Sequence, residues 1–291
     1  MLLTEKLKKT LFSPTEQVVV DYLLDKRSLI ANQTIKMIAE ETYTSPSILI
    51  RISNKMEFGG WTDFKKAFLA EINYLDTHFQ EIDANFPFTE KDSFTTIANK
   101  LGTLLQETIT DSLDLLHHDD LAKAIRLMED APTIKIFTSN INVYLAQDFC
   151  HKMKRINKNV SIISLDGEQV FEATNSDSSV LALLISYSGE TRSITHLLPI
   201  LKKNKVKILA LTNMGENTIA ANADCSLKIS TREKLYSKIG GFSSHYSIYF
   251  LLDTLYSCIF SLNYQKNLDH TIAISKMNDP RCSQLETLKE D

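Results

Sequence analysis

The most constraining feature of this chain is a series of short apolar runs, rich in β-branched residues, that recur beyond Pro132. Helix-length segments separate most of these runs, and that alternation is typical of βαβ units, which form a parallel sheet flanked by helices. The third run is apolar throughout, as expected of a central strand covered on both faces. We therefore expect an α/β C-terminal part built on a parallel five-stranded sheet. The predicted strands span residues 134–137, 160–164, 180–185, 206–211 and 225–229.

The first 77 residues contain only helical patterns. A capping box, Ser-Pro-Thr-Glu at 13–16, opens the first predicted helix. A second predicted helix covers residues 34–41. After a tight break at Tyr43, Ser45 caps a third helix and Pro46 takes its first position. Two short helices joined by a tight turn have the outline of a helix-turn-helix unit.

The third predicted helix has two different faces. Ile48, Ile52 and Met56 recur at helical spacing and form its buried stripe, and the helix is expected to end near Phe58, where the paired glycines 59–60 favour a turn. On the opposite face an arginine can fork to guanine, an asparagine can pair with adenine, and serine or lysine can hold phosphates. A solvated face on a helical bundle is equally compatible with this spacing. Charge does not decide between the two, because residues 1–77 carry ten basic and ten acidic side chains. The candidate DNA contacts are Ser45, Ser47, Arg51, Asn54 and Lys55.

Domain boundaries are predicted where the helical period is lost. Residues 78–92 have no period and contain Pro87, which indicates a linker. Helices are predicted at 93–117 and 121–130, before the first strand, and at 241–262, after the last. At 291 residues the chain is long enough for two cores. The predicted organisation is a helical domain over 1–77, a linker over 78–92, an α/β domain with its leading helices over 93–270, and a loose polar tail over 271–291.

The sharpest chemical motif is Ser-Tyr-Ser-Gly-Glu-Thr at 186–191, between the most apolar strand and a helix-length segment. Backbone N–H groups at a helix N-terminus bind anions, and hydroxyl groups donate further hydrogen bonds. Ser186, Ser188 and Thr191 are therefore candidate ligand-binding residues. The alternative is a loop in which the serines serve only as caps.

Composition argues against several other classes of protein. The net charge of −4 argues against non-specific affinity of the whole chain for nucleic acid. The longest apolar stretch, 248–260, is interrupted by polar residues, and no signal-like pattern opens the chain. We expect a cytoplasmic protein that has no membrane association, no metal and no cofactor. The cysteines are widely spaced and form no CxxC pair, which indicates neither a disulfide framework nor a zinc site: Cys150, Cys225, Cys258 and Cys282.

Residues 45–65 resemble, without a gap, the recognition helix and following segment of the RpiR/MurR family of bacterial transcription regulators. The family pattern has a serine, a small residue, a central arginine, Lys-Leu-Gly-Phe, and then Gly-Phe and an acidic-Phe-Lys ending. This chain departs from it at Ile48, Met56, Glu57 and Trp61. The resemblance implies a protein that reads double-stranded operator DNA, with Arg51 as the central arginine.

The motif at 186–191 resembles the Ser-x-Ser-Gly-Glu-Thr turn of sugar isomerase (SIS) domains, which the RpiR family carries after its DNA reader. In those domains this turn grips the phosphate of a phosphosugar. The resemblance covers about residues 134–260 and implies further ligand contacts at Ser139 and Asn142 in the first loop, and at Glu233 and Ser244 later. That first loop lacks the family's glycines, and we expect Asn140 to adopt the left-handed conformation in their place.

The resemblance leaves a sensor and an enzyme as alternatives. A sugar-phosphate isomerase needs a base near the sugar C1 and C2, and Glu233, His196 and His245 are the available candidates. A DNA-coupled sensor needs no turnover, only different affinities in two conformations. We therefore expect a non-catalytic, phosphosugar-sensing regulator of carbohydrate metabolism. The family resemblance, and the palindromic operators that paired readers recognise, imply a homodimer or homotetramer.

Overall fold

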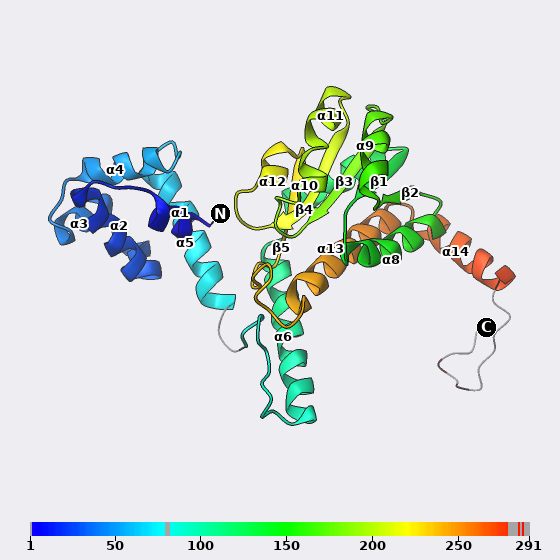
Figure 1. Ribbon diagram of the computed structural model, residues 1–291, viewed down its shortest axis with the longest axis horizontal. Coiled ribbons are helices and arrows are strands. Elements are labelled where there is room, and N and C mark those ends of the chain that lie inside the picture. Colours follow the sequence, from blue (N-terminus) through cyan, green and yellow to red (C-terminus); the bar gives the residue numbers. More distant parts are fainter. Residues whose placement is uncertain (1, 79–81, 279–284, 286, 288–291) are drawn as a thin grey trace. The chain divides into compact units, whose positions relative to one another are not determined.

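The computed structural model describes residues 2–78, 82–278, 285 and 287, which form two compact units (Figure 1). The first unit is drawn mainly from residues up to Glu107 and the second mainly from Thr108 onward, so the division falls within helix α6 (Phe94–Asp114). The first unit has a helical core and the second has a five-stranded parallel sheet, which confirms the predicted fold class.

The first unit packs its helices around an apolar core. The capping box opens α2 as predicted, with the Ser13 amide donating to a Glu16 carboxylate oxygen at 2.9 Å and the Glu16 amide to Ser13 Oγ at 3.4 Å. Phe64 and Phe68 are fully buried, and Trp61 stacks on Phe64 with ring centroids 5.5 Å apart. The elements are α1 (Leu3–Lys9), α2 (Pro14–Lys26), the 3-10 helix η1 (Arg27–Asn32), α3 (Ile35–Glu41), α4 (Pro46–Lys55) and α5 (Trp61–His78).

The second unit alternates strands and helices after α7 (His118–Asp130). All neighbouring strands pair in parallel, in the order β2-β1-β3-β4-β5. The strands are β1 (Thr133–Phe137), β2 (Asn159–Ile163), β3 (Val180–Ser186), β4 (Lys207–Asn213) and β5 (Cys225–Ile229). The helices are α8 (Asn142–Arg155), α9 (Asp166–Thr174), α10 (Arg192–Thr195), α11 (Leu198–Lys203), α12 (Thr218–Asn222), α13 (Phe242–Leu262) and α14 (Tyr264–Asn278).

Helices cover both faces of this sheet, so its central strand is apolar throughout (Figure 1). Leu181, Leu183 and Ile185 of β3 pack into the core formed with α7, α8 and α13. The alternate residues, including Ala182 and Leu184, pack into a second core with α9, α11 and α12. Because successive side chains of a strand point to opposite faces of the sheet, β3 contributes to two separate apolar layers.

The C-terminal region differs from the prediction of a loose tail beginning at residue 271. Helix α14 continues to Asn278 and has no buried residue, so the sequence offers no apolar stripe by which to recognise it. Cys282 and most of the later residues lie outside the described part of the chain. No helix within that part is both long and apolar enough to cross a membrane.

Candidate functional sites

A sharp turn joins α3 and α4. Thr34 caps α3 by accepting a hydrogen bond from a first-turn amide at 3.2 Å. At the other end, Tyr43 adopts the left-handed conformation with φ of 52°, and the Thr44 amide donates to the Ala39 carbonyl at 2.8 Å. This arrangement closes a helix abruptly. Helix α4 therefore begins at Pro46, soon after α3 ends, as the predicted helix-turn-helix unit requires.

Ser45 precedes α4, as predicted, but its hydroxyl does not cap the helix. Ser45 Oγ lies 2.6 Å from Ser47 Oγ instead, and both residues are exposed. The expected cap is therefore wrong, because the neighbouring hydroxyl takes the place of the helix amides as partner. Two hydroxyl groups at a helix N-terminus are well suited to contact a phosphate, since the helix dipole favours negative charge there.

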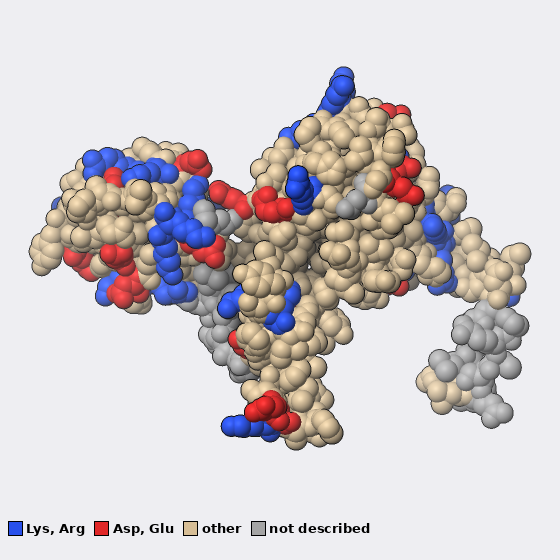
Figure 2. Space-filling view, in the orientation of Figure 1, with Lys and Arg blue, Asp and Glu red and all other residues tan. Residues whose placement is uncertain are grey.

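Helix α4 presents the two faces that its spacing predicts. Ile48, Ile52 and Met56 are buried, whereas Ser47, Arg51, Asn54 and Lys55 are exposed. Figure 2 shows basic side chains along the edge of the first unit where α4 lies in Figure 1. The structure thus brings the predicted contacts together on one exposed surface.

Glu16 of α2 lies close to both basic residues of that face, but the two residues differ in their other contacts. Its carboxylate lies 3.6 Å from Arg51 Nε and 3.5 Å from Lys55 Nζ. Lys55 Nζ also donates to the Leu11 carbonyl at 2.7 Å and lies 4.8 Å from the centre of the Phe12 ring. Lys55 is therefore held by contacts within the unit, while the Arg51 side chain stays 61% exposed.

Helix α4 ends earlier than the paired glycines predict. Glu57 adopts the left-handed conformation, with φ of 68°, and the Phe58 amide donates to the Ser53 carbonyl at 3.0 Å. That bond closes α4 after Lys55, so the helix ends before Phe58 and the glycines at 59–60. The Glu57 side chain pairs with Lys6 Nζ at 2.7 Å, which lowers the pKa of Glu57. The departure from the family's glycine thus places a charged side chain at a strained turn.

The second candidate site is the hydroxyl turn, residues 186–191, at the carboxyl end of β3. Ser186 Oγ lies 2.7 Å from Thr191 Oγ1 and 3.5 Å from Ser188 Oγ, so the three predicted hydroxyl groups converge. The amide of Gly189 donates to Ser186 Oγ at 3.2 Å, and the amide of Glu190 donates to Ser188 Oγ at 3.1 Å. Ser186 is buried, whereas Ser188 and Thr191 are half-buried and accessible.

Gly189 is the one residue of the hydroxyl turn whose conformation requires glycine. Its φ is 69°, and a Cβ at this position would lie 2.1 Å from the Asn217 side chain. Asn217 in turn caps α12 by accepting from the Ala220 amide at 2.9 Å. The Glu190 carboxylate accepts from the amide and hydroxyl of Thr218 at 2.6 and 2.7 Å. The hydroxyl turn is therefore locked onto the start of α12.

The helix after the hydroxyl turn is shorter than the sequence suggests. Helix α10 has only four residues, and α11 follows it with Pro199 in its first turn. Proline lacks the amide that would continue the preceding helix, so one expected helix becomes two. A four-residue helix has a small dipole, and the hydroxyl and amide groups of the turn itself are the available anion donors.

The first loop lies beside the hydroxyl turn because β1 and β3 are neighbours in the sheet. Asn140 has φ of 55°, which confirms its predicted left-handed conformation. Ser139 and Asn142 are half-buried at the start of α8, and no hydrogen bond in the described part of the chain joins either to the hydroxyl turn. Strand order reverses between β1 and β3, and such switch points are where open α/β sheets bind ligands.

Glu233 and Ser244 come together at the start of α13. Glu233 accepts from the amides of Ser243 and Ser244 at 2.5 and 3.2 Å, and from Ser244 Oγ at 2.6 Å. Both Glu233 and Ser244 are buried, with 7% and 2% of their surface exposed. The carboxylate thus satisfies the first amides of the helix, as a capping group does.

Tyr187, for which the sequence pattern predicts no role, links this pair to the hydroxyl turn. Its hydroxyl donates to the Glu233 carbonyl at 2.7 Å and accepts from the Glu233 amide at 3.0 Å. Burial raises the pKa of Tyr187, so the phenol stays protonated. The available signal was a tyrosine directly after an apolar strand, because a buried phenol needs a hydrogen-bond partner.

His196 and His245 are the other two catalytic candidates. His196 is exposed, and its Nδ1 lies 2.9 Å from the Arg192 carbonyl within the same helical turn. His245 is half-buried beside Gly241, where a Cβ would meet the imidazole at 2.3 Å. Within the described residues, no group of three or more His, Cys, Asp or Glu side chains is placed to hold a metal ion.

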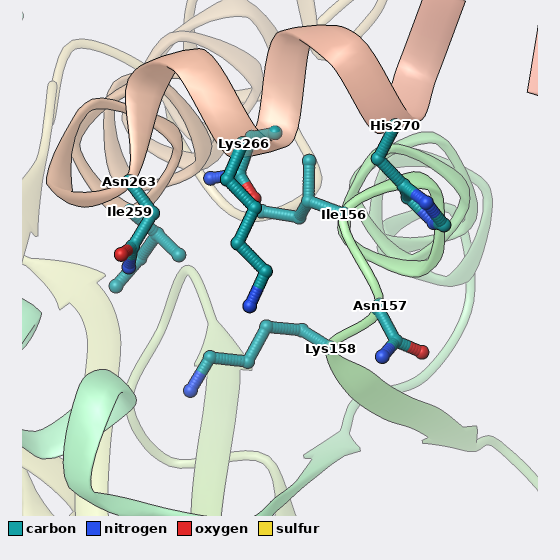
Figure 3. Close-up of a pocket in the computed structure, with 8 residues that line it drawn as sticks. Ile156, Asn157, Lys158, Ile259, Asn263, Lys266 and His270 are labelled. Carbon is teal, nitrogen blue, oxygen red and sulfur yellow. The ribbon is translucent and has the colours of Figure 1, made fainter. Parts of the chain in front are cut away.

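A cavity of about 300 Å³ lies elsewhere in the second unit, between the end of α8, the start of β2 and α14 (Figure 3). Lys158 and Lys266 extend into it, and His270 lies at its side (Figure 3). Lys158 Nζ donates to the carbonyls of Met128 and Glu129 at the end of α7, at 3.2 and 3.1 Å. Because Lys158 precedes β2, this cavity is at the amino-terminal edge of the sheet, opposite the hydroxyl turn.

Two known protein families match the chain. The helix-turn-helix domain of the RpiR family matches residues 1–73, and the SIS domain matches residues 129–258. A helix-turn-helix-type transcriptional regulator of Clostridium perfringens is 26% identical over 288 residues, which cover 96% of this chain and 100% of that protein. The transcriptional regulator RpiR of Escherichia coli K12 is 22% identical over 219 residues, covering 75% of this chain and 72% of RpiR.

Solved structures share the fold. NanR of Vibrio vulnificus, solved with ManNAc-6P, matches with a TM-score of 0.60 and 20% identity over 97% of this chain and 100% of NanR. The sugar isomerase domain of an RpiR transcription factor from Sphaerobacter thermophilus matches with a TM-score of 0.55 and 16% identity, over 62% of this chain and 98% of that one. The chain belongs to the RpiR family of transcriptional regulators, with a helix-turn-helix domain followed by a SIS domain.

Proposed function

We propose that this regulator binds operator DNA through the exposed face of α4, binds a phosphosugar at the hydroxyl turn, and changes its DNA affinity when the sugar binds. The observation that carries the proposal is the convergence of Ser186, Ser188 and Thr191 hydroxyl groups at the switch point of the sheet. NanR, which shares the whole architecture, was solved with the phosphosugar ManNAc-6P, and this supports the same class of ligand here.

The turn supplies donors suited to a phosphate group. Hydroxyl hydrogens of Ser188 and Thr191 can rotate toward a bound anion, while the rigid Gly189 segment keeps the backbone in place. Ser139 and Asn142 in the neighbouring loop, and Glu233 and Ser244 at the start of α13, are the proposed contacts to the rest of the sugar. Specificity for one sugar would come from these outer contacts rather than from the phosphate.

The ligand half is tested by thermal unfolding with a panel of phosphorylated sugars and their unphosphorylated parents. At least one phosphosugar should raise the melting temperature of the wild type, and its parent sugar should not. Ser188→Ala should lose that shift, whereas Ser178→Ala, an exposed serine on another loop, should keep it. A panel in which no phosphorylated sugar stabilises the wild type would count against the proposal.

The DNA half is tested by selection from a random pool of duplexes. The exposed contacts are proposed to be Ser45, Ser47, Arg51, Asn54 and Lys55, with Arg51 reading a base and the hydroxyl groups contacting phosphates. Selection should enrich a two-fold symmetric motif, because paired readers recognise half-sites. Light scattering should accordingly show a homodimer or homotetramer. If selection enriched no motif, the proposal of operator binding would be contradicted. If light scattering showed only a monomer at working concentration, the proposal of paired readers would be contradicted.

We infer that the SIS domain senses rather than catalyses. Three donors from the start of α13 already engage the Glu233 carboxylate, so it is occupied as a structural cap. His196 is exposed and bonded within its own turn. The fold is shared with a putative phosphosugar isomerase of Bacteroides fragilis, at a TM-score of 0.51 and 17% identity, which makes the assay necessary. Incubation with aldose and ketose phosphates should give no isomerisation, and turnover would overturn this inference.

A further inference from the structure

Six buried polar residues join α6 to α13 inside the second unit, and we call them the hydroxyl seam. Each one is fully buried, with none of its surface exposed. Burying polar groups is costly unless each finds a hydrogen-bond partner, so a helix contact built from them needs a reason beyond stability. The members are Thr108, Asp111 and Ser112 of α6, Ser230 just after β5, and Ser243 and Ser247 of α13.

The hydrogen bonds of the hydroxyl seam run in one direction. Ser230 Oγ donates to the Asp111 carboxylate, and it lies 3.2 Å from Ser243 Oγ. A hydroxyl has one hydrogen, so Ser243 is left as the donor to Ser230. Thr108 Oγ1 donates to Ser243 Oγ at 3.0 Å. The chain of donors therefore starts and ends on α6 and passes through Ser243 of α13.

A second branch strengthens this link. Ser247 Oγ, one turn further along α13, lies 2.7 Å from Ser112 Oγ of α6, and the Ser112 hydroxyl is also within 2.7 Å of the Thr108 carbonyl. Ser247 Oγ accepts from the Ser230 amide at 2.9 Å. Both helices thus contribute hydroxyl-bearing residues four positions apart, which lie on one face of a helix. The two helices are joined at two successive turns.

Ser243 also contacts Glu233, a residue of the proposed ligand site. Its amide donates to the Glu233 carboxylate at 2.5 Å, while its hydroxyl belongs to the hydroxyl seam. A ligand that engages Glu233 or Ser244 must compete with the bonds that hold the first turn of α13. A shift of that turn moves Ser243, and the bond between Ser243 and Thr108 must then adjust.

Helix α6 is free of the apolar layers that hold the rest of this unit. Among the described residues, the two cores of the sheet include residues of α7, α8 and α13 on one face and of α9, α11 and α12 on the other, but none of α6. Interdigitated apolar layers resist sliding, whereas hydrogen bonds between hydroxyl groups exchange partners on small shifts. The hydroxyl seam is thus an adjustable attachment of α6, the helix along which the chain passes from the first unit into the second.

We propose that the hydroxyl seam carries the occupancy of Glu233 and Ser244 to α6, and so couples the phosphosugar site to the DNA-binding unit. This role rests on the proposed function of the two sites. Thr108, Ser112 and Ser243 are positioning residues in this scheme, since none of them needs to touch the ligand. Their contribution is to make the position of α6 depend on the state of the first turn of α13.

The test compares full-length wild type, Thr108→Val and Thr103→Val. Valine keeps the shape of threonine and removes the hydroxyl, and Thr103 is a half-buried residue of α6 outside the seam. For each protein, the Kd for the selected operator is measured with and without the stabilising phosphosugar, and the Kd for the sugar is measured alone. Hydrogen exchange of the α6 amides, with and without sugar, reports on the helix directly.

Wild type and Thr103→Val should show the same ligand-dependent ratio of operator affinities, within the roughly 5- to 150-fold range of ordinary allosteric coupling. The Kd of Thr108→Val for the sugar should be within about threefold of the wild-type value. The ratio of its operator Kd values with and without sugar should fall to within about twofold of one. The ligand-induced change in α6 exchange should disappear with it. Ser112→Ala, which breaks the second branch, gives the same comparison if Thr108→Val does not fold.

Wild-type coupling in a folded Thr108→Val or Ser112→Ala protein would overturn the role of the hydroxyl seam and leave the proposed function standing. Loss of sugar binding in these variants would also overturn it, since the seam would then only support the site. If the wild type itself binds sugar and operator with no mutual effect, the proposed function fails at its regulatory step, and the relay fails with it. These outcomes are distinguished by the separate sugar and operator measurements.

Discussion

At the scale of single residues, Arg51 and Lys55 on α4 should contribute to DNA binding unequally. Arg51 has 61% of its side chain exposed, whereas Lys55 is held by the Leu11 carbonyl and Glu16. We predict that Arg51→Ala weakens operator binding by about 1–3 kcal/mol, the range for a lost bidentate base contact. The affinity is measured by fluorescence anisotropy, and the fluorescence of Trp61, the only tryptophan, reports the stability of the first unit.

Arg51→Lys is the matched control, because it keeps the charge and removes the planar fork. It should restore affinity for random DNA more than affinity for the operator. Unfolding of the first unit should change little in either variant, because the Arg51 side chain is largely exposed and the Glu16 carboxylate keeps its contact with Lys55. Equal loss on operator and random DNA in both variants would mean that Arg51 contacts only phosphates.

Gly189→Ala should damage the hydroxyl turn. The added Cβ would meet Asn217 at 2.1 Å, and alanine at φ of 69° is itself strained. We expect a loss of about 1–3 kcal/mol of stability in the second unit and a weaker response to phosphosugars, measured by thermal unfolding. Gly167→Ala in α9 has open space around its Cβ and should be neutral or slightly stabilising. Equal effects of the two substitutions would contradict the role of the Gly189 conformation.

Residue-level prediction succeeded where local chemistry decides the outcome. Asn140 is left-handed as expected, because asparagine tolerates that conformation. Ser45 does not cap α4, because a choice between two hydrogen-bond partners depends on coordinates rather than on spacing. The role of Tyr187 depends on Glu233, which is distant in the sequence, and no local pattern could have joined the two.

At the scale of elements, the end of α4 is strained, and a substitution can relieve this strain. Glu57 is left-handed, and glycine adopts that conformation without cost. We predict that Glu57→Gly raises the unfolding temperature of the first unit, despite losing the pair with Lys6, because that pair is at the surface. Glu57→Ala keeps the strain and loses the pair, and should unfold at a lower temperature than wild type. Trp61 fluorescence during heating measures both, and the reverse order would contradict this explanation.

The start of α2 should make the first unit sensitive to acid. The Ser13 amide bond lowers the pKa of Glu16 below its ordinary value of 4.5, with Lys55 adding to the effect. A lowered pKa contributes stability that is present above pH 4.5 and lost as the pH falls through the folded-state pKa. We expect the unfolding temperature of the wild type, followed by Trp61 fluorescence, to fall below about pH 4.5. The unfolding temperature of Glu16→Gln should depend less on pH in this range. The same slope in both proteins would exclude Glu16 as its source.

Elements with a strong period were predictable, and short or fully exposed ones were not. The apolar runs predicted all five strands, because a parallel sheet covered on both faces needs them. The segment after β3 forms two short helices because Pro199 interrupts it. Helix α14 has no buried residue and so leaves no stripe to detect.

At the scale of the whole molecule, the chain joins two units, each with its own core and its own candidate site. The sites are 45–55 on the first unit and the hydroxyl turn, with Glu233 and Ser244, on the second. The family resemblance was visible in two ungapped motifs, and the family matches over 1–73 and 129–258 agree with it. The hydroxyl seam was not visible, because it joins α6 to α13 across 135 positions of sequence.

We propose that one phosphosugar controls the affinity of this protein for its operator. The most direct measurement is the operator Kd of the full-length wild type in the presence of each stabilising phosphosugar and of its unphosphorylated parent. We predict that at least one phosphosugar changes the operator Kd by about fivefold or more, and that its parent sugar does not. An operator Kd that stays the same at saturating concentrations of a phosphosugar shown to bind would contradict this proposal.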